Sequence, residues 1–313
     1  MRYANILETV GNTPMIELKS FNPRPEVHIF AKLEGVNPSG SIKDRIAKKM
    51  IEKAESQHLL TAGSILLEPT SGNTGVALAL AANMKGYPFT AVISEKGTQD
   101  KRRLLELYGA KIITSPGAAG SNGAIRLAQE LVEQDRRYVM LYQYGNEANA
   151  AAHETTGAEI IEDMPGVHVF VAGLGTGGTL TGVARRLKRH NPTIRVVAAE
   201  PVQGDSIQGL RNLADGFVPP VLDLSVIDAR LLVSSRDAWI RTLQLKAQEG
   251  IFAGPSSGAV LEVALRMAAT MDRGKIVIIL ADGGWKYMSE DHWMAKLPLP
   301  SSVVATMADK VAL

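Results

Sequence analysis

The chain contains no cysteine among its 313 residues. This absence excludes disulfide bonds, thiolate metal ligands and a catalytic thiol. Its six histidines are scattered and form no HxxxH or HxH pair, which argues against a metal site. The chemistry of this chain must therefore come from other side chains or from a bound organic group.

The chain also has no large excess of charge of one sign and no long apolar run. The formal net charge is only +2 and no dense Lys/Arg block is present, so nucleic acid and anionic membrane surfaces are not expected partners. No apolar run reaches membrane-spanning length, and the opening "MRYANILETVGNTP" lacks the apolar core of a signal peptide. With 45% hydrophobic residues, the composition predicts a cytoplasmic enzyme with a substantial core.

Strand and helix signals alternate along the chain in two series. The first series begins with a strand at 64–70 and a helix at 76–86 that Gly86 closes, and it continues to about residue 144. The second begins with a strand at 167–173 and ends with a helix at 258–270 and a strand at 275–282. Apolar, β-branched strands that alternate with amphipathic helices predict an α/β fold with mostly parallel sheets, each doubly wound with helices on both faces.

Two stretches interrupt this alternation. The polar, strand-poor segment 145–157 lies between the two series and is the candidate domain junction. The segment 202–230 is rich in Gly, Asp and Pro and predicts long irregular structure, which in a compact domain is often functional.

Ligands of parallel sheets bind at the carboxyl ends of strands, in loops that lead into helices. The first such loop, "PTSGNTG" at 69–75, is dense in hydroxyl, amide and backbone N–H donors. It could hold an anion at a helix N-terminus. An ordinary strand–helix turn is the plainer alternative.

The second loop is "GLGTGGTLTG" at 173–182. Gly173, Gly175 and Gly178 satisfy GxGxxG, and Glu200 closes the next strand, so a dinucleotide-binding fingerprint is one interpretation. Thr176 and Thr179 favour instead a terminal phosphate monoester, because its oxygens need hydroxyl and amide donors around them.

The third loop, "GPSSG" at 254–258, fits the GxSxG pattern of a hydrolase nucleophile elbow. Asp282 and His292 follow Ser256 in the order that α/β-hydrolases use. Against this interpretation, the triad would occupy only the last fifth of the chain, and no HGGG-type oxyanion segment is visible. A hydrolase would also leave the other two loops without a role.

One lysine needs a separate explanation. In "NPSGSIKDR", Ser41 is predicted to cap a helix and Asp44 to complete a capping-box-like pattern. Lys43 then lies in the first turn, where the helix dipole disfavours a cation. A solvent-exposed lysine is the plain interpretation, but an amine that must spend time uncharged would benefit from this position.

These motifs together resemble the cysteine synthase family of pyridoxal 5'-phosphate (PLP) enzymes, of fold type II. The resemblance runs in the family's order from "GNTPMIEL" at 11–18 through the lysine motif and the three loops to "ADGGWKY" at 281–287. It implies a tryptophan synthase β-like fold. Residues 1–38 and 147–313 would form a larger domain that binds the cofactor phosphate, and residues 39–146 a smaller, mobile one.

The resemblance also implies a role for each matching residue. Lys43 would hold PLP covalently and act as general base on the substrate, and Asn73 would bond the cofactor's ring hydroxyl. The phosphate would lie on Gly175, Thr176, Gly177, Gly178 and Thr179, and Ser256 would meet the pyridine nitrogen. The substrate α-carboxylate would be bound by Thr70, Ser71, Thr74 and Gln143. Because a serine at the pyridine nitrogen does not deepen the electron sink, β-replacement is favoured over transamination.

Within the family, "LLELYGA", "MLYQYGN" and "LRNLADGFVP" resemble the O-phosphoserine sulfhydrylase branch. That branch's phosphate-recognising arginine corresponds to Arg211, and a phosphate leaving group suits a guanidinium fork. The expected activity is therefore synthesis of L-cysteine from an O-activated serine, with O-acetylserine as the alternative donor. Serine or threonine dehydration is a more distant alternative. The family further implies a homodimer, whereas the sulfur donor, including a sulfur-carrier protein, stays open.

Overall fold

Two β-sheets organise the chain, and the computed structural model describes residues 2–70, 72–95 and 99–294 of it. A six-stranded sheet has the order β1-β2-β10-β7-β8-β9, and a four-stranded sheet has the order β5-β4-β3-β6. All neighbouring strands are parallel except β1 and β2. The predicted α/β fold with mostly parallel sheets is confirmed.

The strands and helices have the following bounds. The strands are β1 Met15–Glu17, β2 Val27–Leu33, β3 Ile65–Pro69, β4 Phe89–Ser94, β5 Lys111–Ser115, β6 Tyr138–Met140, β7 Val169–Gly173, β8 Arg195–Pro201, β9 Ala229–Val233 and β10 Gly274–Leu280. The helices are α1 Lys43–Ser56, α2 Asn73–Lys85, α3 Gln99–Leu107, α4 Gly120–Gln134, α5 Glu147–Asp163, α6 Gly178–His190, α7 Ser235–Glu249 and α8 Pro255–Ala269.

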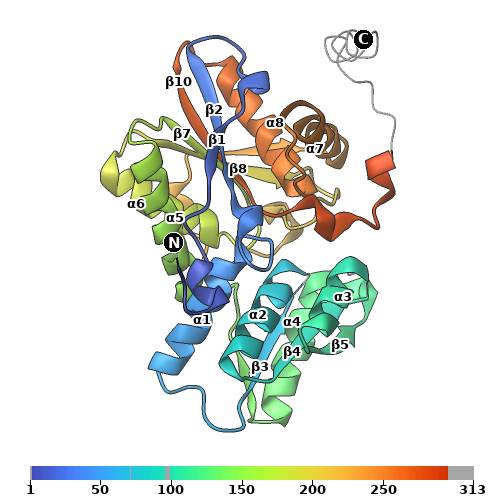
Figure 1. Cartoon of the computed structure of the whole chain (residues 1–313). Helices are drawn as coiled ribbons and strands as arrows, with labels where there is room; N and C mark the ends of the chain where they lie inside the picture. The colour runs from blue at the N-terminus through green and yellow to red at the C-terminus, as the bar shows by residue number, and fades with distance from the viewer. Residues whose placement is uncertain (1, 71, 96–98, 295–313) are drawn as a thin grey trace.

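The two sheets occupy different parts of the molecule. In Figure 1 the four-stranded sheet lies in the lower part with α2, α3 and α4, and the six-stranded sheet lies above it with α5 to α8. Every strand of the smaller sheet falls within 39–146, and the larger sheet draws its strands from both flanking segments. The domain boundaries and the mobility of the smaller part stay predictions.

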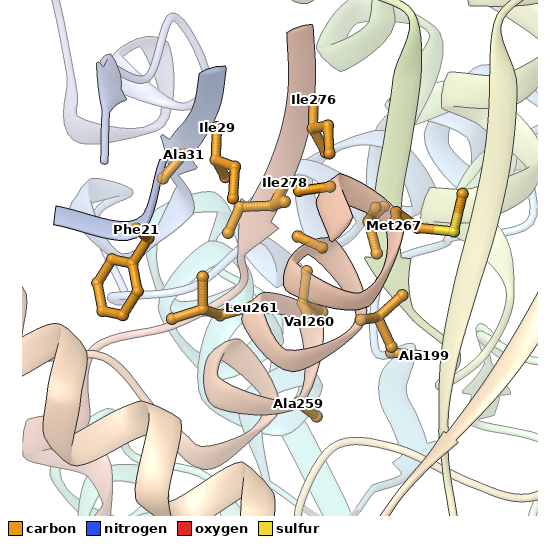
Figure 2. Close-up of a cluster of buried hydrophobic side chains, with 14 of the residues drawn as sticks. Phe21, Ile29, Ala31, Ala199, Ala259, Val260, Leu261, Met267, Ile276 and Ile278 are labelled. Carbon is orange, nitrogen blue, oxygen red and sulfur yellow. The ribbon is translucent and has the colours of Figure 1, made fainter. Parts of the chain in front are cut away.

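The core of the larger sheet is built around α8. Figure 2 shows Val260 and Leu261 of this helix close to side chains of the neighbouring strands, among them Ile29 of β2 and Ile278 of β10. These side chains are at most 1% exposed. Strands of a parallel sheet are buried on both faces, which explains why β10 reads as the continuous apolar run "IVIIL".

Several elements were not predicted from the sequence. The strands β1, β2 and β9 and the helix α7 were not predicted. The segment 145–157, predicted to be a polar junction, contains the first 11 of the 17 residues of α5. This helix is capped by Asn146, whose side chain accepts from the N–H of Ala148. Its small residues Ala148, Ala150 and Ala152 are buried, so packing stabilises a helix with little amphipathic signal.

Candidate active site

The loops that follow β3, β7 and β10 meet at two adjoining cavities. Both cavities are lined by Lys43, Asn73, Gly175 and Thr176. The first cavity also includes Gly177, Thr179 and Ser256, and the second includes Thr74, Gln143 and Arg211. The structure thus brings Lys43 and Ser256, which lie 213 residues apart in the sequence, into one cavity.

Three predicted residues line neither cavity or cannot be placed. Thr70 is 4% exposed, and its Oγ1 accepts hydrogen bonds from the N–H groups of Gly72 and Gly75. Gly178 begins α6, directly behind the lining residues, and Ser71 lies outside the described residues. Thr70 therefore shapes the loop, and its contact with substrate stays a prediction.

Lys43 is the first residue of α1, as its position after "NPSGSI" predicted. The expected N-cap was one residue off, because Ile42 holds that position and makes no side-chain cap. Ser41 is held elsewhere: its backbone bridges to Asp282, and its Oγ accepts from the Lys43 N–H at 3.3 Å. Burial lowers the pKa of Lys43 to about 8, although the charge of Asp282 acts in the opposite direction. The lowered pKa increases the share of neutral amine near pH 7, and a nucleophile or base must be neutral.

Asp282, Asn73 and Lys286 form a buried polar network beside Lys43. The Nδ2 of Asn73 donates to Asp282 at 2.5 Å, and the Lys286 Nζ donates to the Asn73 Oδ1 at 3.1 Å. Tyr287 also donates its hydroxyl to Asp282. Burial lowers the pKa of Lys286 to about 8, and it raises that of Tyr287 well above 10. The network fixes both ends of the Asn73 side chain.

The glycine-rich loop 173–177 leads from β7 into the N-terminus of α6. A Cβ on Gly178 would lie 1.9 Å from the Asn149 Oδ1, so only glycine allows this approach between α5 and α6. The hydroxyl of Thr176 accepts from the Asn149 Nδ2 at 3.0 Å. Backbone N–H groups at the positive end of a 13-residue helix, with two threonine hydroxyls, make an anion site.

His153 lies behind that anion site and was missed by the sequence reasoning. It is fully buried on α5, and its Nε2 lies 3.2 Å from the Thr179 Oγ1. Burial lowers its pKa well below 6.5, and the charges of Lys43 and Arg45 act in the same direction. A neutral imidazole therefore orients the Thr179 hydroxyl.

The second cavity has a polar wall built from α2 and the turn after β6. Thr74 donates its hydroxyl to the Gln143 Oε1 at 2.7 Å. Tyr142 has a φ of 54°, and the N–H groups of Tyr142 and Gln143 both donate to the carboxyl of Glu68. Glu68 is fully buried at the end of β3, and burial raises its pKa to about 8. This carboxyl, also missed from the sequence, holds the turn that presents Gln143.

Arg211 reaches the second cavity from the irregular segment 202–228, where the structure contains only two short 3₁₀ helices. Its guanidinium carbon lies 5.0 Å from the ring centroid of Tyr144 and 4.7 Å from that of Phe217. Cation–π contacts on both rings hold the charge in place, and no carboxylate among the described residues forms an ion pair with it. The guanidinium is therefore available to an anion.

The geometry contradicts the hydrolase interpretation. The carboxylate of Asp282 accepts from Asn73 and Tyr287, not from a histidine. The ring of His292 stacks on Trp239 with 4.7 Å between centroids. Ser256 lies in the first turn of α8 after Pro255, so it is not a nucleophile on a strained strand–helix elbow. The proposed triad of Ser256, Asp282 and His292 is not assembled.

The dinucleotide interpretation also finds no support in the geometry. Glu200 is 1% exposed and lines neither cavity. Its carboxylate accepts from the N–H of Leu213 and from the guanidinium of Arg230. Within the described residues, no helix is long and apolar enough to cross a membrane, and no cluster of three metal-ligating side chains occurs.

Comparison with known proteins identifies the family. The profile of the family described as "Pyridoxal-phosphate dependent enzyme" matches residues 6–282. A protein of Bacillus subtilis (strain 168) described as "Probable cysteine synthase" is 40% identical over 303 residues, which cover 93% of this chain and 97% of that protein. A "Cysteine synthase" of Staphylococcus aureus (strain Mu50) is 38% identical over 296 residues, covering 91% of this chain and 95% of the relative.

Solved structures agree with these relatives. The crystal structure of O-ureido-L-serine synthase superposes with a TM-score of 0.90 at 36% identity, covering 98% of this chain and all of that one. O-acetyl serine sulfhydrylase isoform 3 from Entamoeba histolytica gives a TM-score of 0.89 at 34% identity, covering 98% and 96%. The chain belongs to the pyridoxal-phosphate-dependent enzymes of fold type II. Within that family, it is an enzyme of the cysteine synthase class.

The residues of the first cavity fit PLP. Lys43 supplies an amine with a lowered pKa, and the N-terminus of α6 supplies the anion site for a phosphate. Ser256 and Asn73 add a hydroxyl and an amide to the same cavity. The particular bonds assigned to these residues stay proposals.

Proposed function

We propose that the enzyme makes L-cysteine by β-replacement on an O-activated serine, with O-phosphoserine as the preferred substrate. The observation that carries this preference is Arg211, which lies in the same cavity as Thr74 and Gln143 and forms no ion pair with a carboxylate in the part of the chain that the structure describes. A guanidinium can pair with a phosphate dianion through two parallel hydrogen bonds, and an acetyl group offers no such charge.

When bound, PLP supplies the electron sink that allows the substrate to lose its Cα proton. The protein's residues do the rest in this proposal. Lys43 accepts the Cα proton on its neutral Nζ, while Thr74 and Gln143 orient the α-carboxylate. Arg211 stabilises the negative charge that develops on the leaving phosphate. A sulfur nucleophile then bonds to Cβ, and the proton returns to Cα.

Donor preference can be tested by single-turnover spectroscopy. The holoenzyme is mixed separately with O-phosphoserine and O-acetylserine, and the change in the visible band of the cofactor is followed without a sulfur donor. We expect a faster change with O-phosphoserine. An enzyme that reacts faster with O-acetylserine would contradict the preference and favour an O-acetylserine sulfhydrylase, which the relatives fit equally well. Accumulation of pyruvate with both substrates at full turnover rate would indicate a dehydratase.

Homodimer formation is a prediction from the family resemblance, a cytoplasmic location is a prediction from the composition, and a sulfur-carrier protein is one of the donors that stay open. The first can be measured by light scattering of the holoenzyme. The last can be measured by comparing sulfide, thiosulfate and a protein thiocarboxylate as donors.

A further inference from the structure

Besides Lys43 and Arg211, a third cationic side chain lines the substrate cavity. Lys101, on α3, is 5% exposed and lines the second cavity together with Lys43 and Arg211. Its aliphatic chain passes over the "SGNTG" loop so closely that a Cβ on Gly72 would lie 2.2 Å from the Lys101 Cδ. The amine therefore approaches the cavity from above the loop that contains Asn73 and Thr74.

The lining of this cavity is charged with one sign. Three of its side chains are cationic, and none of the described residues that line it is an aspartate or glutamate. Cationic groups in a water-poor cleft reinforce each other's attraction for an anion. One of the three, Lys43, is committed to the cofactor and to the Cα proton, so Lys101 and Arg211 are left to meet the substrate's anionic groups.

The groups in direct contact with the Lys101 ammonium are uncharged. Its Nζ donates to the amide oxygen of Gln208 at 2.9 Å and lies 4.2 Å from the ring centroid of Tyr287. Among the described residues it forms no ion pair, and the influence of Asp282, Glu290 and Asp100 is exerted at longer range. Burial of this amine lowers its pKa. A buried cation is costly unless something anionic accompanies it.

We propose that Lys101 is a second anion-binding residue of the substrate cavity, which together with Arg211 holds the phosphate leaving group. The inference rests on the proposed use of O-phosphoserine. In the described structure the Gln208 amide oxygen occupies one donor of the Lys101 ammonium. Two donors remain for phosphate oxygens.

A purely structural role is the competing explanation, because the same lysine joins α3 to the larger sheet's side of the cleft. The Nε2 of Gln208 donates a hydrogen bond to the Glu290 carboxylate at 2.6 Å. Asp100, next to Lys101 on α3, accepts hydrogen bonds from the N–H and the hydroxyl of Ser289. Loss of this contact would affect every substrate alike. Loss of an anion-binding charge would affect only anionic ligands.

The experiment measures binding of inorganic phosphate to the holoenzyme, by its competition with the amino-acid substrate and by titration of the cofactor's visible absorbance. Lys101→Met removes the charge, and Lys101→Arg retains it. Gln208→Leu breaks the structural contact while leaving the charge. Arg103→Met removes an exposed cation from the same helix and is the matched control.

We expect Lys101→Met to weaken phosphate binding about 10- to 150-fold, the worth of a hydrogen bond to a charged group. Arg103→Met, Gln208→Leu and Lys101→Arg should stay within about threefold of wild type, since a threefold change is well under 1 kcal/mol. If Lys101→Met does not fold, Lys101→Gln is measured in its place. This variant also removes the charge, but its side-chain amide can still donate a hydrogen bond to Gln208. Unchanged phosphate binding in the neutral variant, or equal weakening in Gln208→Leu, would overturn the inference.

Failure of this inference differs from failure of the proposed function. A wild-type preference for O-acetylserine would contradict the function, whichever residues bind phosphate. Phosphate competition that persists unchanged in Lys101→Met would contradict the role of Lys101 even if O-phosphoserine is the better substrate.

Discussion

Asn73 and Asp282 are 209 residues apart in the sequence, and the Nδ2 of the asparagine donates to the Oδ2 of the carboxylate at 2.5 Å. The bond joins the start of α2 to the segment after β10. Because the backbone of Ser41 also bridges to Asp282, one aspartate ties together the lysine motif, the "SGNTG" loop and the "ADGGWKY" segment. Asp282 therefore positions both Lys43 and Asn73.

Asp282→Asn should lower the pKa of Lys43 further below about 8, because the negative charge that now opposes the effect of burial is removed. The rate at which apoenzyme takes up PLP depends on the neutral amine. Its rise with pH should therefore begin at a lower pH in the variant. Asp272→Asn is the control, since that side chain is fully exposed. An unshifted profile would show that Asp282 does not act on Lys43.

Lys43→Met should stabilise the apoenzyme at neutral pH. The folded protein lowers the pKa of Lys43 from 10.5 to about 8, so the unfolded chain binds this proton more tightly. The cost to folding is at most about 3 kcal/mol below pH 8, and it diminishes as the pH rises from 8 toward 10.5. Urea unfolding of wild type and Lys43→Met at pH 7 and pH 9 measures the free energy of unfolding of each protein at each pH. The variant's advantage should be about 1 kcal/mol smaller at pH 9. Lys49→Met, at an exposed position of the same helix, should show no comparable gain.

Glu68→Gln should loosen the turn that presents Gln143. The two oxygens of Glu68 accept from two backbone N–H groups, and an amide can replace only one acceptor. An unsatisfied buried donor costs about 1–3 kcal/mol of unfolding free energy. KM for the amino-acid substrate should rise while bound PLP is unchanged.

Because folding raises the pKa of the Glu68 carboxyl to about 8, wild-type stability should fall as the pH rises from 4.5 to 8. Glu68→Gln should not show this fall in stability with pH, whereas the exposed control Glu106→Gln should still show it.

Ser256→Ala should retain PLP and weaken β-replacement without abolishing it. The serine is 5% exposed in the cofactor cavity, and no histidine of the described residues forms a hydrogen bond with it, so its hydroxyl can bind but is not activated for attack. Cofactor content is read from the visible band, and the rate from cysteine formation. A fluorophosphonate probe should leave wild-type Ser256 unlabelled. Labelling of that serine in a protein devoid of PLP would restore the esterase interpretation.

Borohydride reduction tests the covalent link that the resemblance predicts. The treated holoenzyme should carry PLP on the peptide that contains Lys43, whose amine lines the cavity and has a lowered pKa. Lys286→Met is the matched variant, because Lys286 is the competing site for the covalent link. Lys286 is also buried with a pKa near 8, but it donates to Asn73 and lines neither cavity. Modification of Lys286 in place of Lys43 would contradict the assignment.

Sequence reasoning identified the residues that lie in strand–helix loops, because parallel strands place the loops after them at one edge of a sheet. Asn73 and Thr176 were found in this way, whereas Lys43 was singled out by its place in the first turn of a helix and Ser256 by the GxSxG pattern, and the family resemblance supplied their roles. Residues that support the site from behind could not be found. Glu68 looked like part of a buried strand, and His153 lay in an alanine-rich helix with little amphipathic pattern. Their roles depend on contacts made 26 to 75 residues away, which no local pattern encodes.

Arg211 should select the leaving group. Its guanidinium contacts the rings of Tyr144 and Phe217, and Arg211 lines the same cavity as Thr74 and Gln143. A hydrogen bond to a charged group contributes about 1.5–3 kcal/mol, so Arg211→Ala should lower kcat/KM for O-phosphoserine by roughly 10- to 150-fold. The loss for O-acetylserine should be much smaller, and bound PLP should be unchanged. Arg211→Lys should rescue only partly, because an ammonium lacks the bidentate fork. Both donors are measured on wild type and on each variant. An equal loss for the two donors would show that Arg211 holds the loop rather than the phosphate, and the O-acetylserine enzyme would then be the better description.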